Sequence, residues 1–164
     1  MNAAKTSLRG GSGIDGAIHA AAGPRLLAAC LQQHPNGCPV GQARSTPGFN
    51  LPAQYVIHTV GPVWSNSTKV QATPLLRSAY DNSFQEAQRL NVSSVAIPCI
   101  STGIYGFPSR DAAHVAFAAA RTFLAGPAAN SKVHPKHNAF IPSAYFHTFP
   151  SADNRHLLPL LTGR

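Results

Sequence analysis

Two glycine-bearing loops are the segments of this chain best suited to binding a ligand. Residues 8–16 read Leu-Arg-Gly-Gly-Ser-Gly-Ile-Asp-Gly, and residues 101–108 read Ser-Thr-Gly-Ile-Tyr-Gly-Phe-Pro. Glycine lets the backbone adopt positive φ and approach a ligand closely. Each loop runs into a predicted helix, whose N-terminus presents free N–H groups and the positive end of a dipole to an anion. Either loop alone could be an ordinary turn, but the pair in a basic chain predicts a site for a small phosphate-bearing ligand.

Neither loop is a nucleotide-binding motif in its usual setting. Lys5-Thr6 has no upstream glycines, so it is not a Walker A motif. No Gly-x-Gly-x-x-Gly with a following ribose-binding acid lies in a strand–helix–strand setting. These absences argue against a kinase and against an NAD-dependent dehydrogenase.

Asp15 is the carboxylate most suited to chemistry, because it alone among the acids lies in a glycine-rich loop. The other acids are expected on helix faces or ends as solvated charges: Asp81, Glu86, Asp111 and Asp153. A glycosidase mechanism with paired carboxylates therefore lacks a second partner. His19 follows Asp15 by four residues and would share its helix face if the helix starts early, although a structural histidine is an equal alternative.

Metal-binding and nucleophilic signatures are not recognisable. The cysteines Cys30, Cys38 and Cys99 are odd in number and lack framework spacing, which indicates buried thiols rather than disulfides. His134 and His137 are too loosely spaced from the cysteines for a metal site, and no Ser-His-Asp or Cys-His signature is found. We therefore expect no metal.

The predicted elements place the second loop at the end of a strand. Helices are predicted over 17–22, 24–33, 74–90, 109–124 and 152–161, and strands over 43–46, 55–60, 92–100 and 144–149. The alternation of strand and helix predicts an α/β layered fold with a mostly parallel sheet. Ligands of such sheets bind beyond the carboxyl ends of the strands, which is where residues 101–108 follow a strand.

Composition sets limits on size and partners. The chain has 164 residues, enough for one domain, and its formal charge is +8. That charge favours anionic partners, but the basic residues are scattered and form no nucleic-acid-binding run. No apolar stretch reaches the ~18 residues of a membrane span, and the first residues lack a signal-peptide core. The default expectation is a soluble, cytoplasmic protein without a membrane partner.

Three long motifs occur in order over about the first three quarters of the chain. Asn2-Ala-Ala is followed at 10–24 by Gly-Gly-Ser-Gly-Ile-Asp-Gly-Ala-Ile-His-Ala-Ala-Ala-Gly-Pro. Residues 51–62 read Leu-Pro-Ala-Gln-Tyr-Val-Ile-His-Thr-Val-Gly-Pro, and residues 100–108 read Ile-Ser-Thr-Gly-Ile-Tyr-Gly-Phe-Pro. With these motifs the chain resembles a macro domain of the MacroD type, close to the bacterial O-acetyl-ADP-ribose deacetylases.

The resemblance implies a single three-layer α/β/α domain over residues 1–164, with an irregular linker at 126–143 before a last strand and helix. It also implies binding of ADP-ribose and hydrolysis of its esters, either O-acetyl-ADP-ribose or mono-ADP-ribose on acidic side chains of proteins. Asp15 matches the catalytic aspartate, and no cofactor is implied. The ligand-binding positions implied are Asn2, Lys5, Gly10, Gly11, Gly13, Ile14, His19, Ser101, Thr102, Gly103, Ile104, Tyr105, Gly106, Phe107 and Phe149.

Among these positions, the first loop would line the ribose and pyrophosphate, and residues 101–107 would wrap the diphosphate. Tyr105 or Phe107 would pack on the distal ribose, and Phe149 would lie near the adenine.

Two features depart from the family pattern. The family motif reads Asn-Ala-Ala-Asn, and its second Asn helps to hold the distal ribose, whereas this chain has Lys5 there. A cation beside Asp15 would favour the ionised carboxylate and make it a weaker base, or it could attract the diphosphate. We therefore expect slower hydrolysis with retained binding. The chain also begins at Met1, where the family has already formed about two strands, so an N-terminally shortened domain is expected.

Three functions remain open on the sequence. The first is an ADP-ribosyl-ester hydrolase with Asp15 at its centre. The second is an ADP-ribose-binding module with little catalysis, which Lys5 favours. The third and least favoured is a single-stranded RNA binder that uses the positive surface and stacking aromatic residues.

Overall fold

The computed structural model describes residues 1–125 and the strand at 143–147. Its elements in chain order are β1 (Asn2–Ala3), α1 (Gly13–Ala22), α2 (Pro24–Gln33), β2 (Ala43–Pro47), β3 (Tyr55–Thr59), α3 (Lys69–Arg89), β4 (Ser94–Pro98), α4 (Ser109–Ala125) and β5 (Ser143–His147). Among the described residues, no helix is both long and apolar enough to cross a membrane.

The strands form two hydrogen-bonded ladders. In the first, β3 lies between β1, which is parallel to it, and β2, which is antiparallel. In the second, β4 and β5 are parallel. The ladders meet at β1 and β4, where the Met1 amino group donates a 2.6 Å hydrogen bond to the carbonyl of Ala96. The described sheet is thus mixed and mostly parallel, as the sequence predicts.

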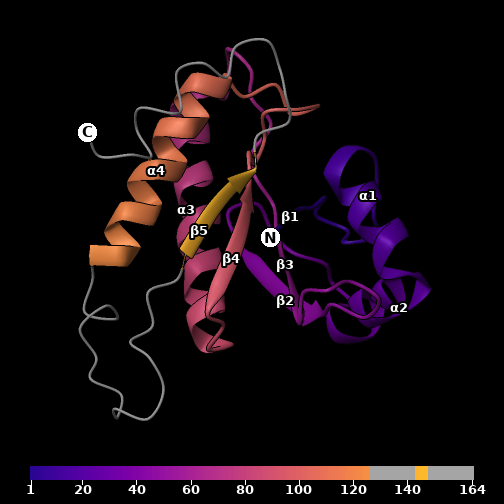
Figure 1. Cartoon of the computed structure of the whole chain (residues 1–164). Coiled ribbons are helices and arrows are strands. Elements are labelled where there is room, and N and C mark those ends of the chain that lie inside the picture. The colour runs from indigo at the N-terminus through magenta and orange to yellow at the C-terminus, as the bar shows by residue number, and fades with distance from the viewer. Residues whose placement is uncertain (126–142, 148–164) are drawn as a thin grey trace.

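Helices cover both faces of these strands. Figure 1 shows α3 and α4 on one side and α1 and α2 on the other. The pair α3–α4 packs together over β2 and β3, and the pair α1–α2 contacts β1 and β2. This arrangement confirms the predicted three-layer α/β/α fold.

Each helical layer closes its own apolar cluster. On the α3–α4 side, Leu76, Tyr80 and Phe84 pack with strand residues and with small buried residues of α4. On the α1–α2 side, Leu26 packs with Val56. Fully burying one large apolar side chain stabilises a fold by roughly 1.5–3 kcal/mol, so these clusters hold the layers against the sheet.

Some element boundaries differ from the sequence prediction. Helix α3 begins at Lys69, five residues before the predicted start at Pro74, which lies inside it. Ser65 and Thr68 explain the early start, because each accepts a hydrogen bond from the other's backbone N–H through its hydroxyl. Such reciprocal bonds satisfy donors that a helix start leaves free. The interior proline is tolerated although it cannot donate a helical hydrogen bond.

The glycine-rich segment and the tail also differ from expectation. Helix α1 starts at Gly13, so the end of the predicted loop belongs to the helix. Residue 143, expected in the linker, is the first residue of β5. The rest of that linker and the last predicted helix, 152–161, lie outside the described residues.

Tyr80 connects α3 to the start of the second glycine-bearing loop. Its hydroxyl donates to the carbonyl of Pro98 at 3.1 Å and accepts from the N–H of Ile100 at 3.0 Å. The side chain is fully buried, so water cannot replace these bonds. One hydroxyl therefore satisfies two backbone groups where β4 ends.

We expect Tyr80→Phe to lower the free energy of unfolding by about 1–3 kcal/mol, because it leaves two buried backbone groups unpaired. Urea denaturation measures the change. Tyr55→Phe is the matched control: Tyr55 is 39% exposed, and its replacement should change stability little. Equal effects of the two substitutions would contradict this role for the Tyr80 hydroxyl.

Candidate functional site

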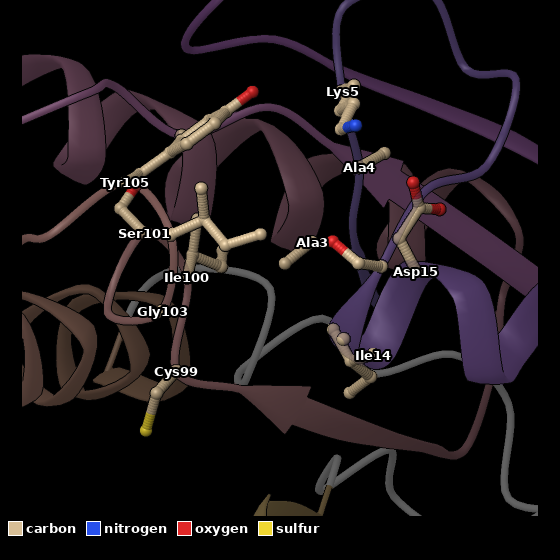
Figure 2. A pocket seen from close by; sticks show the side chains of 14 residues that line it. Ala3, Ala4, Lys5, Ile14, Asp15, Cys99, Ile100, Ser101, Gly103 and Tyr105 are labelled. Carbon is tan, nitrogen blue, oxygen red and sulfur yellow. The ribbon is translucent and has the colours of Figure 1, made fainter.

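A cavity of about 220 Å³ lies beyond the carboxyl ends of β1, β3 and β4, against the first turn of α1. Figure 2 shows Asp15 and Lys5 on one side of it and Tyr105 across from them. The lining residues are Ala3, Ala4, Lys5, Ser12, Gly13, Ile14, Asp15, Gly61, Cys99, Ile100, Ser101, Gly103, Ile104 and Tyr105. This is the place where parallel α/β sheets bind ligands.

The first turn of α1 forms one wall of the cavity. The N-cap residue Ser12 makes no side-chain capping bond. Consequently, the first N–H groups of α1 are not satisfied by their own cap, and they lie at the positive end of the helix dipole. Because Ser12, Gly13 and Ile14 all line the cavity, this wall is suited to a phosphate.

The loop after β4 forms the facing wall. It is closed by two backbone bonds: the N–H of Phe107 donates to the carbonyl of Ser101, and the N–H of Gly106 to that of Gly103, both at 2.9 Å. Ser101 has φ 67° and Gly106 has φ 65°, so the turn uses left-handed backbone at both ends. A second anchor is the 2.8 Å bond from the N–H of Trp64 to the carbonyl of Tyr105.

Close packing beneath this loop requires glycine at position 61. A Cβ there would overlap the side chains of Ser101 and Ile100. Ser101 is buried, and its hydroxyl has no hydrogen-bond partner among the described residues. The cavity wall therefore offers a polar group that a ligand can satisfy.

Asn2 anchors the carboxylate of Asp15 by a hydrogen bond. The amide Nδ2 of Asn2 donates to Oδ1 of Asp15 at 2.8 Å and also lies 3.1 Å from Nδ1 of His58. The other carboxylate oxygen, Oδ2, is buried and has no partner among the described residues. His19 lies beside the carboxylate, with Nε2 3.6 Å from Oδ1. Asp15 thus has one oxygen anchored and one oxygen free.

His58 continues this chain of contacts away from the cavity. It is fully buried in β3, and its Nε2 lies 2.9 Å from the hydroxyl of Thr46 in β2. Burial, followed by the nearby positive charges of His19, His34 and the N-terminus, lowers the pKa of His58 to about 3. His58 is therefore neutral at physiological pH.

Lys5 lies at the cavity edge, close to Asp15. A Cβ at Gly11 would be 3.2 Å from Nζ of Lys5 and 3.3 Å from Oδ2 of Asp15, so both side chains pack against this glycine. Within residues 1–125, Lys5 is exposed, and its side chain forms no ion pair or hydrogen bond. Its ammonium remains available to a ligand anion.

One cluster of metal-ligating atoms adjoins the site: His19, Cys30 and His58 offer atoms within 4.8 Å of one another. Two observations oppose a metal there. Nε2 of His58 already contacts the Thr46 hydroxyl. Burial and then the charge of Asp15 raise the pKa of the Cys30 thiol to about 11, so the thiolate that a metal needs is costly to form.

Cys99 does line the cavity, but burial raises its thiol pKa as well. A protonated thiol is a poor nucleophile. Cys99 therefore contributes shape rather than reactivity.

The predicted site residues fall into three groups in the structure. Lining the cavity are Lys5, Gly13, Ile14, Asp15, Ser101, Gly103, Ile104 and Tyr105. Outside its lining are Asn2, Gly10, Gly11, His19, Thr102, Gly106 and Phe107. Phe149 lies outside the described residues.

Residues outside the lining support those within it. Asn2 and His19 contact Asp15, and Gly10 lies against the ring of His19. Thr102 closes its turn by donating to the carbonyl of Cys99 at 3.0 Å. Of the two residues expected to pack on the distal ribose, Tyr105 lines the cavity, whereas the ring of Phe107 is 2% exposed and packs on Trp64 in the core.

The sequence reasoning missed several lining residues: Ala3, Ala4, Ser12, Gly61, Cys99 and Ile100. Most directly follow the carboxyl ends of β1, β3 and β4. Applying the strand-end rule to every parallel strand would have found these positions. The supporting roles of His58 and Thr46 had no sequence signal, because their contacts cross between strands.

An α/β/α fold with its cavity at the strand ends defines a ligand-binding α/β domain. A family model described as "Macro domain" matches residues 1–116, so the chain belongs to the macro domain family. It is 54% identical over 116 residues to a macro domain-containing protein of Ralstonia nicotianae, covering 71% of this chain and 66% of that protein. The matched region therefore spans just under two thirds of that relative.

Other similar proteins carry names that describe activity or ligands. An O-acetyl-ADP-ribose deacetylase of Klebsiella pneumoniae is 52% identical over 126 residues, covering 76% of this chain and 71% of the relative. The Trypanosoma brucei macrodomain solved in complex with ADP-ribose has a TM-score of 0.71 and 38% identity, covering 88% of this chain and 55% of that one.

The neutral state of His58 predicts a pH dependence of stability. Since its pKa is lower in the folded than in the unfolded chain, its stabilising contribution is complete above about pH 6.5 and is lost as the pH falls toward 3. The free energy of unfolding should fall by about 2 kcal/mol between pH 7 and pH 5 from this group.

Urea denaturation across that pH range measures this loss, and ¹⁵N NMR of the imidazole reports the protonation directly. Replacing exposed His114 by Gln is the control and should leave the slope unchanged. A His58 ring that is doubly protonated in the folded protein at pH 5 would contradict the prediction.

Proposed function

We propose that this chain binds ADP-ribose and hydrolyses ADP-ribose esters, with Asp15 as the catalytic residue. The observation that carries the proposal is the state of Asp15: it is the acid that lines the cavity, one oxygen is anchored by Asn2, and the other is buried without a partner. A carboxylate held in this way can bind or deprotonate a water molecule.

The two walls of the cavity are suited to binding a diphosphate between them. The first turn of α1 offers N–H groups and the dipole, and the loop 101–106 offers backbone and the free hydroxyl of Ser101. A diphosphate there would place an attached ribose ester near Asp15. The names of the Klebsiella relative and the Trypanosoma complex agree with this ligand and this reaction.

The chemistry requires no group beyond water. Asp15 accepts a proton as the water oxygen bonds to the ester carbonyl carbon. The bond from that carbon to the ribose oxygen then breaks, and the ribose oxygen takes up a proton. The products are ADP-ribose and a carboxylic acid, and the acid is either acetate or the acidic side chain of a modified protein. Positioning by the diphosphate walls contributes to the rate.

Lys5 favours a second candidate function, an ADP-ribose-binding module with slow turnover. Its free ammonium packs against Gly11 at the edge of the cavity, where it would attract the diphosphate and retain the product. RNA binding gains less support: Tyr80, Phe84 and Phe107 are buried and not free to stack on bases, and of the tyrosines only Tyr55 is among the exposed large side chains of the described residues.

The role of Asp15 is tested by Asp15→Asn, which removes the base and keeps the shape. Hydrolysis of O-acetyl-ADP-ribose should fall by about 100-fold or more, while ADP-ribose affinity measured by calorimetry should stay within about threefold. Asp111→Asn on α4 is the matched control and should retain full activity. An unchanged rate in Asp15→Asn would overturn the catalytic assignment, and an absence of heat with ADP-ribose would overturn the ligand.

The role of Lys5 is tested by Lys5→Asn. Removing the cation should weaken ADP-ribose binding severalfold, because its attraction to the diphosphate is lost, and should raise the turnover rate by up to about tenfold, because the product is released sooner. Arg121→Asn removes one positive charge from α4, away from the cavity lining, and should change neither quantity. If both variants behave like the wild type, Lys5 does not set the balance between binding and turnover.

A further inference from the structure

His58 is a buried histidine that the proposed reaction does not use. It lies in the middle of the sheet and does not line the cavity. It pairs in register with Asn2 of β1, so the two side chains project to the same face of the sheet. Its two ring nitrogens face different polar groups: Nδ1 faces the amide of Asn2, and Nε2 faces the hydroxyl of Thr46 at 2.9 Å and, farther away, the thiol of Cys30 at 3.7 Å.

The hydrogen bonds of Asn2 reveal which ring nitrogen of His58 carries the proton. Nδ2 of Asn2 is 2.8 Å from a carboxylate oxygen of Asp15, which only accepts hydrogen bonds, so the amide nitrogen must face it. The second hydrogen of that amide then donates to Nδ1 of His58 at 3.1 Å. Nδ1 is therefore unprotonated, and the single proton of the neutral ring lies on Nε2 and is donated to Thr46.

Any other state of His58 conflicts with the bond to Asp15. A proton on Nδ1 would face the NH₂ group of Asn2 and drive the amide to flip. The flipped amide would turn its oxygen toward the carboxylate of Asp15, and both groups would then be acceptors without a shared hydrogen. The titratable groups that face or influence His58 are Asp15 through Asn2, Cys30 at 3.7 Å, His19, His34 and the N-terminus.

We propose that His58 is a positioning residue for the reaction, and that Thr46 holds it in the Nε2–H form that orients Asn2 and thereby Asp15. This inference rests on the proposed function of Asp15. Through these contacts, Oδ1 of Asp15 is fixed by Asn2, and Oδ2 is left without a partner for the attacking water. Side chains of β2, β3 and β1 thus determine the orientation of the Asp15 carboxylate, although Asp15 itself belongs to helix α1.

The test replaces the hydroxyl of Thr46 and leaves the cavity lining untouched. Thr46→Val removes the acceptor for Nε2–H with little change in shape, and Thr46→Ser restores a hydroxyl. Thr59→Val is the matched control, because Thr59 is equally buried next to His58, and its hydroxyl donates to Gln42 and Ala79 outside this chain of contacts. Each protein is assayed for kcat and KM with O-acetyl-ADP-ribose and examined by ¹⁵N NMR of the histidine rings.

We expect kcat of Thr46→Val to fall by about ten- to a hundredfold with KM within about twofold, as for a misplaced catalytic group. Thr46→Ser should recover the wild-type kcat, and Thr59→Val should retain it. NMR should show His58 as Nε2–H in the wild type and Thr46→Ser, and partly as Nδ1–H in Thr46→Val. Equal losses in Thr46→Val and Thr59→Val, or an Nδ1–H ring in the wild type, would overturn the proposal.

The tautomer measurement also separates this inference from the proposed function. A wild type that shows the Nε2–H ring but hydrolyses no ester would overturn the assignment of the reaction, and with it the catalytic purpose of the positioning. A wild type that hydrolyses the ester with an Nδ1–H ring would overturn the positioning alone.

Discussion

The amide of Asn2 is the contact on which the organisation of the site depends. It belongs to a buried side chain at the first residue of the two-residue strand β1, and it donates both hydrogens, one to the carboxylate of Asp15 and one to the ring of His58. A buried amide has a high cost if its donors are unpaired, so both partners are constrained by it. One side chain thereby couples the middle strand of a ladder to the first turn of α1.

The contact between Asn2 and Asp15 also determines how the elements that form the cavity are placed. With Asp15 drawn toward β1, the uncapped N-terminus of α1 faces the loop that follows β4. Glycine is required where these elements approach closely, since a Cβ at Gly61 would overlap Ser101 and a Cβ at Gly16 would overlap the carbonyl of Gly11. Apart from the Asp15 carboxylate, both walls then offer hydrogen-bond donors, which suits an anionic ligand.

Much of the architecture was predictable because it depends on local patterns. The strand at Tyr55–Thr59 and the helix at Pro24–Gln33 follow from β-branched runs and apolar spacing, and the structure places both close to the predicted ranges. The start of α3 was not predictable from Pro74, because side-chain bonds between Ser65 and Thr68 begin the helix earlier. The family resemblance implies Phe107 as a ligand-binding residue, yet its ring is buried against Trp64.

The sequence by itself determined the kind of site: two glycine-bearing loops before helices, a lone acid within one of them, and a surplus of positive charge. These features are local, so their chemistry can be interpreted without coordinates. Only the tertiary structure decided that Asn2, His58 and Thr46, which come from three strands, meet beneath Asp15. The physical reason is strand register, which sets side-chain contacts between segments that no local pattern relates.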